Sequence, residues 1–488
     1  MSHDVILLSS SPIIRAIGSY RIRTVLERQG YRVKLIDFAD SANDASTLKL
    51  LLSRYCTSKT KMIGISTTFW MQERSDSSLK KNKLDKLEKI CEWIKIKWPH
   101  IKIVLGGART LEMVNTSIDY VVSGYADNSV LALMDCITDK SNNLIIQKSN
   151  ACDMPLINSN KDYKDIDIDN IDTVWKKEDH ILPHEPLPIE IARGCIFKCA
   201  FCAYPLNGKK KFDYIRTVDS LVQEFQYNYE NFGTIHYDFM DDTYNDSEFK
   251  LNLLDDVFRQ LNFKITFCTY IKPELLVNWP HHVDQLHEQG FQGATMGIES
   301  LNPKTRAAIQ KGKNIDKILK GCSELSQFSY NQSSLIFGLP HESIKSIRSG
   351  VQQQLDSKIF NRLSIKALGI YHPEYTTESI KSKSLIDQNP GKYGYDIDLN
   401  DKTYWPYANW KNDYTCYEEA RELRIELFLN TEYNALISSW DITKLKFVDM
   451  NLAHHIENKT IMSTINPEIR EKRNKIIANY HKNIWYDN

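Results

Sequence analysis

Three cysteines stand close together near the middle of the chain, in the run ARGCIFKCAFC at residues 192–202. A cubane iron-sulfur cluster normally takes four cysteine ligands, so three would leave one iron open to a small chelating molecule. A zinc site usually has paired CxxC units or histidines at short spacing, and no such pair lies near this run. The spacing therefore favours a 4Fe-4S cluster on Cys195, Cys199 and Cys202 over a zinc site or three unrelated cysteines.

The same run resembles the signature of the radical S-adenosylmethionine (SAM) superfamily. The resemblance lies in the CxxxCxxC spacing, in Phe201 before the last cysteine and in the preceding Arg193-Gly194. It implies that the open iron takes the amino and carboxylate groups of SAM. It also implies that an electron from the cluster cleaves SAM to methionine and a deoxyadenosyl radical, with Phe201 and Tyr204 as residues that contact SAM. The cofactors would then carry the difficult chemistry.

Composition narrows the class of protein. With 488 residues, of which 42% are hydrophobic, the chain can bury a large core and form two or three domains. Ten cysteines are too few for a disulfide scaffold, and the first apolar run, residues 5–8, is too short for a secretory segment. We therefore expect a cytoplasmic, reduced protein.

Two classes of partner are disfavoured by the same composition. No apolar stretch approaches the roughly 20 residues that a membrane helix needs, so no membrane association is expected. The formal net charge is zero, which gives no overall attraction to nucleic acid. The substrate must therefore be inferred from local sites.

Residues 1–140 alternate short apolar strands with helical patterns. We expect strands at 5–8, 32–36, 62–66, 102–105 and 120–122, and helices at 14–29 and 79–97. Strand-helix alternation at this pitch predicts an α/β fold in which a doubly wound, Rossmann-like parallel sheet is covered on both faces.

Loops after the strands of such a sheet hold the ligand. Here they include Ser66 and the pair Gly106-Gly107, and glycines let a cofactor approach backbone N–H groups. Together these loops resemble the cobalamin-binding-type domain that precedes many radical SAM cores, which implies cobalamin near these three residues. The histidine motif that supplies a cobalt ligand in that family is missing, and residues 9–12, Ser-Ser-Ser-Pro, take its place. A Rossmann-like domain without corrinoid therefore stays open as the alternative.

Residues 141–186 are polar and read as an interdomain connection, and residues 187–375 alternate strands and helices again. We expect six strands, at 188–191, 235–240, 265–269, 294–298, 333–337 and 363–368. Six strands match the partial (β/α)6 barrel of the radical SAM superfamily, in which reactive groups sit at the carboxyl ends of the strands.

Carboxylates follow two of these strands. Asp241 and Asp242 follow the second, where they would hydrogen-bond the SAM amino group or ribose, or would cap the next helix. Glu299 and Ser300 end the fourth strand, and by resemblance they face the methionine and ribose parts of SAM. A charge such as that of Glu299 at a strand end inside a barrel needs a partner.

The fifth strand ends in the sequence FGLPHE, residues 337–342. It is similar to the Gly-Leu-Pro-Gly-Glu turn of the superfamily, which makes Gly338 a further candidate for contact with SAM. His341 replaces the second glycine of that turn. A histidine can transfer a proton near neutral pH, although a loop histidine without a catalytic role is the more common case.

Residues 376–488 form a C-terminal extension with an aromatic-rich stretch at 393–414 and a helical pattern at 417–429. The aromatic residues would line a substrate site or stack bases. Without interleaved Lys or Arg, packing over the open side of the barrel is the favoured reading.

The sequence therefore predicts a cytoplasmic radical SAM enzyme that modifies an unactivated carbon, with cobalamin-dependent C-methylation as the first reading. Its substrate would be a small molecule or a peptide, and its electron donor a flavodoxin or a ferredoxin. A corrinoid-independent rearrangement, cyclisation or oxidation is the alternative. A methylthiotransferase usually has three further cluster cysteines in its amino-terminal domain. It is disfavoured here because Cys56, Cys91 and Cys136 fall in helical or irregular segments and not in strand-end loops. An iron-sulfur redox sensor without catalysis is the non-enzyme alternative.

Overall fold

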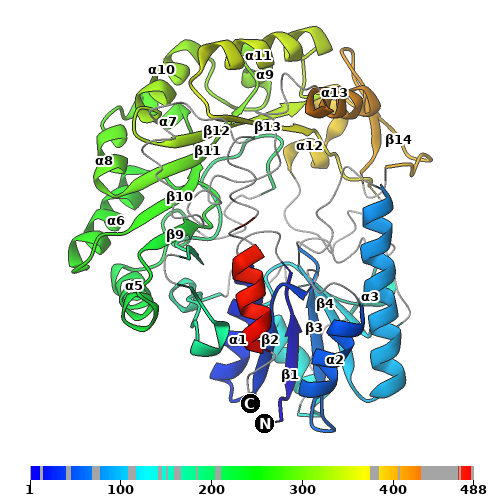
Figure 1. Ribbon diagram of the computed structural model, residues 1–488. Helices are drawn as coiled ribbons and strands as arrows, with labels where there is room; N and C mark the ends of the chain where they lie inside the picture. The colour runs from blue at the N-terminus through cyan, green and yellow to red at the C-terminus, as the bar shows by residue number, and fades with distance from the viewer. Residues whose placement is uncertain are drawn as a thin grey trace. The chain divides into compact units, whose positions relative to one another are not determined.

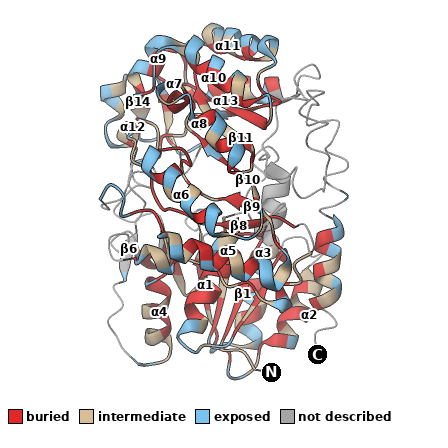
Figure 2. Ribbon diagram, turned by 90° about the vertical axis from the view of Figure 1, so that its left-hand side faces the viewer, coloured by how far each residue is buried: buried red, intermediate tan, exposed pale blue. Residues whose placement is uncertain are grey.

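In the computed structural model, the N-terminal strands pair into one sheet of order β2-β1-β3-β4-β5-β7-β6 (Figure 1). All neighbours are parallel except β6 and β7. The strands are β1 (Val5–Leu8), β2 (Val33–Ile36), β3 (Met62–Ser66), β4 (Lys102–Gly106), β5 (Tyr120–Ser123), β6 (Gln147–Ser149) and β7 (Cys152–Asn158). Every residue of β1 is buried (Figure 2), as expected for a strand in the middle of a parallel sheet.

The described helices between the strands of this sheet are α1 (Ile17–Arg28), α2 (Ala45–Tyr55), α3 (Ser77–Lys97) and α4 (Ser129–Ile137). Helix α1 contacts α4, and α2 contacts α3. The predicted Rossmann-like sheet is confirmed. The helices α2 and α4 and the strands β6 and β7 were not predicted, and both strands come from the polar stretch that we expected to be a connection.

The second sheet contains six parallel strands in chain order, β8 to β13, as the six-strand prediction requires. They are β8 (Leu187–Ile189), β9 (His236–Phe239), β10 (Thr266–Ile271), β11 (Phe291–Glu299), β12 (Tyr330–Phe337) and β13 (Arg362–Ala367). The helices between them are α5 (Val218–Phe232), α6 (Glu248–Gln260), α7 (Glu274–Asn278), α8 (His282–Glu288), α9 (Pro303–Ala308), α10 (Ile315–Leu325) and α11 (Ile344–Ser357).

Short polar side chains start several of these helices. The N-cap residues whose side chains accept a backbone N–H of the first turn are Thr217, Ser247, Asn302, Asn314 and Ser343. Each cap satisfies one of the free amides at a helix start. The cap residues therefore define where the loops after β8, β9, β11 and β12 stop and the next helices begin. This sets the length of the loops that carry the site.

The described part of the chain after β13 contains α12 (Leu385–Gln388), the antiparallel pair β14 (Asp396–Asp398) and β15 (Asn409–Lys411), and α13 (Tyr417–Leu429). The structure describes residues 2–10, 15–39, 45–68, 77–107, 117–140, 146–149, 152–158, 166–182, 185–203, 210–373, 384–404, 407–429, 471 and 474–484.

The chain divides into two units, and the C-terminal end returns to the first. Unit 1 is Met1–His180, Glu374–Lys381 and Ile477–Asn488, and unit 2 is Ile181–Pro373 and Ser382–Ile476. A last helix, residues 474–484, is red in Figure 1 and lies beside the first sheet. Its Tyr480 hydroxyl accepts a hydrogen bond from the Asp37 amide (3.0 Å) and donates one to the Leu35 carbonyl (3.2 Å).

Replacing Tyr480 with phenylalanine should destabilise unit 1. The change leaves the buried Asp37 amide without its partner, which costs about 1–3 kcal/mol in the free energy of unfolding. Chemical denaturation measures the loss. Tyr31→Phe is the matched control, because the Tyr31 hydroxyl accepts a hydrogen bond from the exposed Lys140 ammonium, and a loss as large in this control would contradict the assigned role of Tyr480.

Candidate functional site

The three cysteines lie on one loop of unit 2, residues 193–203, which follows β8 and is called the cysteine loop below. Cys195 is buried, whereas Cys199 and Cys202 are partly exposed. Burial raises the pKa of the Cys195 thiol, and the Thr243 hydroxyl 3.4 Å from its sulfur opposes that rise. Three cysteine thiols on one short loop are a donor set for an iron-sulfur cluster, so the residues present fit that cofactor.

Asp241 and Asp242 hold the backbone of this loop and of the segment before it. One oxygen of Asp241 accepts from the amides of Ile191 and Ala192 (both 3.2 Å), and Asp242 accepts from the amide of Gly194 (3.0 Å). The predicted alternative, a helix cap at Asp241, is wrong, because Ser247 caps α6.

A fully buried lysine completes the Asp241 site. Lys250, on α6, lies 2.5 Å from the second oxygen of Asp241 and donates to the carbonyl of Thr243 (2.8 Å). Both side chains of the pair have 0% exposure, so neither charge has solvent to replace its partner. The carboxylate that we expected to meet SAM thus has both oxygens engaged within the protein.

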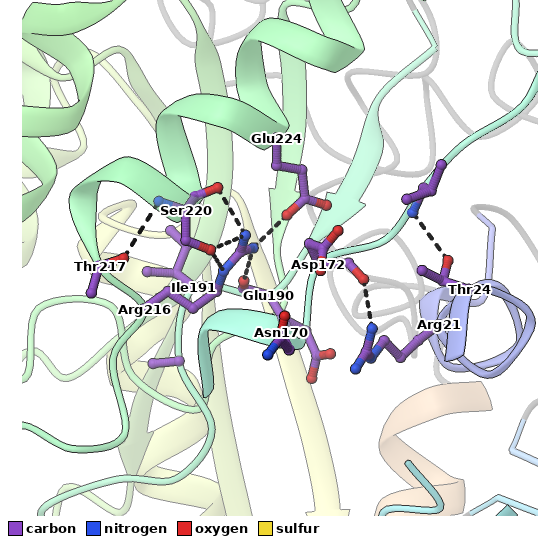
Figure 3. Close-up of polar contacts among 12 residues, drawn as sticks. Arg21, Thr24, Asn170, Asp172, Glu190, Ile191, Arg216, Thr217, Ser220 and Glu224 are labelled. Carbon is purple, nitrogen blue, oxygen red and sulfur yellow. Dashed lines mark hydrogen bonds and ion pairs between the residues drawn. The ribbon is translucent and has the colours of Figure 1, made fainter. Parts of the chain in front are cut away.

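Arg216 fixes the chain just ahead of the loop (Figure 3). Its guanidinium donates to the Glu190 carbonyl (3.1 Å), to Ser220 and to the Glu224 carboxylate. Its own amide donates to the carbonyl of Ile191 (2.9 Å). Figure 3 also draws Arg21 of unit 1, which donates to the Asp172 carbonyl within its own unit (2.9 Å). Arg216 has 0% exposure, and its charge is paired with Glu224.

The far end of the cysteine loop is tied by backbone bonds. The Ala200 amide donates to the carbonyl of Ile309 (3.1 Å), and the Ala200 carbonyl accepts from Ile386 (2.9 Å). Phe201, the expected SAM contact, lies on this part of the loop and is partly exposed. Tyr204, the other aromatic candidate, falls outside the described residues.

Glu299 stands at the end of β11 with a backbone that L-residues rarely adopt, φ +66°. It follows an irregularity in the pairing of β11 with β12. One carboxylate oxygen lies 3.6 Å from the Lys311 ammonium, and the other is buried with no hydrogen-bond partner among the described residues. Burial raises the pKa of Glu299, and Lys311 opposes this rise. A positive φ and a buried oxygen without a described partner are features that often occur together at ligand sites.

Glu299 belongs to a buried group of charges. Glu274 pairs with Arg306 and lies 3.8 Å from Lys311, and Lys311 donates to the carbonyl of Gly297 (2.6 Å). Arg306 also donates to the carbonyls of Ile298 and Ser300. These cations fix the strand end that carries Glu299. Of this group, the sequence indicated Glu299 and the segment through Lys311; nothing in it singled out Glu274 or Arg306.

Ser300 does not present a free hydroxyl. It donates to Glu342 (2.7 Å) and accepts from the amide of Asn302 (3.0 Å). Glu342 is 4% exposed, and desolvation raises its pKa to about 7, with the Ser300 bond opposing the rise. Glu299, Ser300 and Glu342 line one small pocket.

At Gly338, an aromatic residue of the C-terminal extension leaves no room for a side chain. A Cβ at Gly338 would lie 2.3 Å from the ring of Trp410, and the Gly338 carbonyl accepts from the Tyr395 hydroxyl (2.7 Å). Trp410 and Tyr395 are buried, so these two aromatics pack on the end of β12, as the favoured reading expected. The exposed His341 adopts φ +63°, which explains why a glycine suits this position.

The strand-end loops of unit 1 contain the three residues expected near cobalamin. Ser66 ends β3, and the carbonyl of Gly106 accepts from the Thr67 amide (2.8 Å). A Cβ on Gly106 would meet no described atom within 4 Å, whereas one on Gly107 would lie 2.6 Å from the Thr68 hydroxyl oxygen and 3.1 Å from the Thr67 amide nitrogen. Ser66, Gly106 and Gly107 thus lie together at the carboxyl ends of β3 and β4, and the space beside Gly106 is open among the described residues.

Comparison with known proteins agrees with this architecture. Residues 189–350 match the Radical SAM superfamily. The fold resembles the radical S-adenosylmethionine methyltransferase TsrM from Kitasatospora setae, solved with cobalamin and a 4Fe-4S cluster bound. The TM-score is 0.65 at 14% identity, with 97% of this chain and 100% of that chain covered. It also resembles OxsB, a cobalamin-dependent S-adenosylmethionine radical enzyme, at TM-score 0.60 and 11% identity over 97% and 72% of the two chains.

A curated relative adds a sequence match. Bacteriochlorophyllide d C-8(2)-methyltransferase of Chlorobaculum tepidum is 26% identical over 235 residues, which is 45% of this chain. The match spans 50% of the relative's own length. Among the described residues, no helix has the length and apolar character to cross a membrane.

Replacing Asp241 with asparagine should weaken the cysteine loop. Asparagine keeps an oxygen for the backbone amides but leaves the Lys250 charge buried and unpaired, which costs about 3–5 kcal/mol. Denaturation and the iron content after anaerobic reconstitution should both fall. The control is Asp256→Asn, which changes an exposed carboxylate on α6, the helix that carries Lys250. Equal behaviour of the two variants would rule out this role for Asp241.

Replacing Glu342 with glutamine should change how stability depends on pH. The folded pKa of Glu342 is about 7 against an ordinary value of 4.5, so the folded state binds more protons than the unfolded state between these values. Wild-type stability should therefore fall as pH rises from 4.5 to 7, by up to about 3 kcal/mol relative to Glu342→Gln, and stay level above that range. Parallel stability curves for the two proteins would contradict the assignment.

Proposed function

We propose that this chain, which carries a radical SAM domain, is a cobalamin-dependent enzyme that transfers a methyl group to an unactivated carbon of a small molecule or peptide. The observation that carries the proposal is the cysteine loop after β8 together with Glu299 at the end of β11, a buried carboxylate with one oxygen that has no hydrogen-bond partner among the described residues. The resemblance in fold to TsrM and OxsB extends over both units and supports the same reading.

Cys195, Cys199 and Cys202 would hold the cluster, which supplies a single electron to SAM when both are bound. The protein's part is positioning, because a reaction that starts with electron transfer depends on distance and orientation. Asp242 would hold the first part of the cysteine loop, and Asp241 and Arg216 the segment just ahead of it, so these residues would position the chain that carries the three thiolates.

Glu299 is the residue that we assign to the SAM amino group or ribose. Its second oxygen has no described partner, and a charged donor placed there would offset the cost of burying the carboxylate. Phe201 would cover the adenine or methionine part of SAM. Asp241, Asp242, Ser300 and Gly338 would act on SAM through the loop and strand ends that they shape.

Unit 1 would hold the corrinoid, which supplies the methyl group when bound. Gly106 offers open space at the strand edge, and the buried hydroxyl of Ser10 has no described partner, so polar groups and room occur on loops of the same unit. The sequence has no histidine motif in the first loop, so the cobalt would bind without a protein imidazole. A corrinoid-independent radical reaction is the second candidate.

The reaction needs a low-potential electron donor. A flavodoxin or ferredoxin in a reducing compartment such as the cytoplasm fits this requirement. No disulfide joins any of the nine cysteines whose side chains the structure describes, which accords with that setting.

Anaerobic reconstitution tests the central proposal. The wild-type protein should take up iron and sulfide and cleave SAM with a chemical reductant, and alanine at Cys195, Cys199 or Cys202 should abolish cleavage. Cys416→Ala, a partly exposed cysteine outside the loop, is the control and should keep activity. Zinc without sulfide would refute the cluster, and a cluster without any SAM cleavage would favour the redox sensor.

Replacing Gly106 with leucine should lower cobalt uptake and leave iron content unchanged. The new side chain enters space that is open among the described residues, so loss of cobalt would report cofactor exclusion and not collapse of the loop. A bulky residue at Gly107 is a poor test, because its Cβ already collides with the Thr67–Thr68 backbone. Cobalt is measured after purification from cells supplied with cobalamin. Its repeated absence from wild type, with SAM cleavage retained, would support the corrinoid-independent reaction.

A further inference from the structure

Lys272 lies against the cysteine loop and was not among the residues that the sequence indicated. Its ammonium is 3.7 Å from the sulfur of Cys199 and 4.6 Å from the ring centre of Phe197, the aromatic residue between the first two cysteines. The side chain is 11% exposed. One lysine therefore contacts a cysteine and the connection between two of the cysteines.

The backbone of Lys272 is held in place before any cofactor binds. Its amide donates to the side chain of Asn245 (2.9 Å), and its carbonyl accepts from the same side chain (3.2 Å). Asn245 has 0% exposure. This two-way bond joins the segment after β9 to the residue after β10, so the lysine starts from a fixed position.

The charge on Lys272 is only partly balanced. Its one carboxylate neighbour among the described residues is Glu274, at 3.6 Å, and Glu274 also pairs with Arg306 and Lys311. Lys311 itself acts electrostatically on Cys199. Lys272, Arg306 and Lys311 thus share the two buried carboxylates Glu274 and Glu299, so this group carries an excess of positive charge, and Lys272 is its member in contact with Cys199.

We propose that Lys272 tunes the reduction potential of the cluster by donating an N–H···S hydrogen bond to the Cys199 thiolate. The proposal rests on the function proposed above. Hydrogen bonds to the sulfurs and the local charge set the potentials of iron-sulfur clusters. Reduction adds one electron, supplied by the external donor, to a site that three thiolates already make negative. A fixed cation favours that state and makes the cluster easier to reduce.

The experiment measures the midpoint potential of the cluster without SAM. Lys272→Met removes the charge and the donor but keeps the alkyl chain, and the equilibrium for reduction should become at least tenfold less favourable. For a one-electron couple this is a shift of about 59 mV to more negative potential. Lys272→Arg keeps a charged donor and should restore most of the wild-type value. Lys320→Met, at a lysine that is 80% exposed on α10, is the matched control and should not move the potential.

The outcomes separate this inference from the proposed function. If Lys272→Met holds a full cluster at the wild-type potential, the tuning role is overturned while the proposed function stands. If Lys272→Met changes only the affinity for SAM, the lysine binds SAM and does not tune the cluster. If wild type forms no cluster, the proposed function fails first. Should Lys272→Met not fold, Lys272→Gln takes its place, because it removes the charge and keeps a neutral donor. A potential more negative than that of wild type then supports the inference, and the wild-type potential overturns it.

Discussion

The buried pair of Asp241 and Lys250 is the interaction on which the candidate site depends. Both side chains are fully removed from solvent, so each charge is tolerable only because the other lies 2.5 Å away. The other oxygen of the Asp241 carboxylate accepts hydrogen bonds from two backbone amides just ahead of the cysteines. The pair therefore links α6, the segment after β9 and the start of the cysteine loop, so that a shift of one of these segments would disturb the contacts of the others.

Buried charges are also paired at the carboxyl ends of other strands of unit 2. Glu274, Glu299, Arg306 and Lys311 follow or end successive strands of unit 2, and parallel strands bring their carboxyl ends to one edge. Burial makes each of these charges costly alone, so they pair. One oxygen of Glu299 has no hydrogen-bond partner among the described residues, so it keeps acceptor capacity there.

Packing and internal hydrogen bonds account for several residues that sequence patterns mark. Gly338 has no side chain because the ring of Trp410 occupies that space, and Ser300 is used by Glu342. Glu342 in turn keeps a raised pKa because burial outweighs that single hydrogen bond. A strand-end motif in this fold therefore contains residues that shape the site as well as residues that face it.

The sequence by itself determined the two sheets, the single loop with three cysteines and the strand ends that carry Asp241, Glu299 and Gly338. Apolar periodicity and residue spacing are local properties, so they can be read along the chain. Only the tertiary structure decided that Asp241 meets Lys250, that Trp410 covers Gly338 and that Lys272 reaches Cys199. It also returned Tyr480 to the first sheet, 443 positions from its partner Asp37. These contacts join residues far apart in sequence, and each is selected by the energy of burying charge or filling space, which no local pattern records.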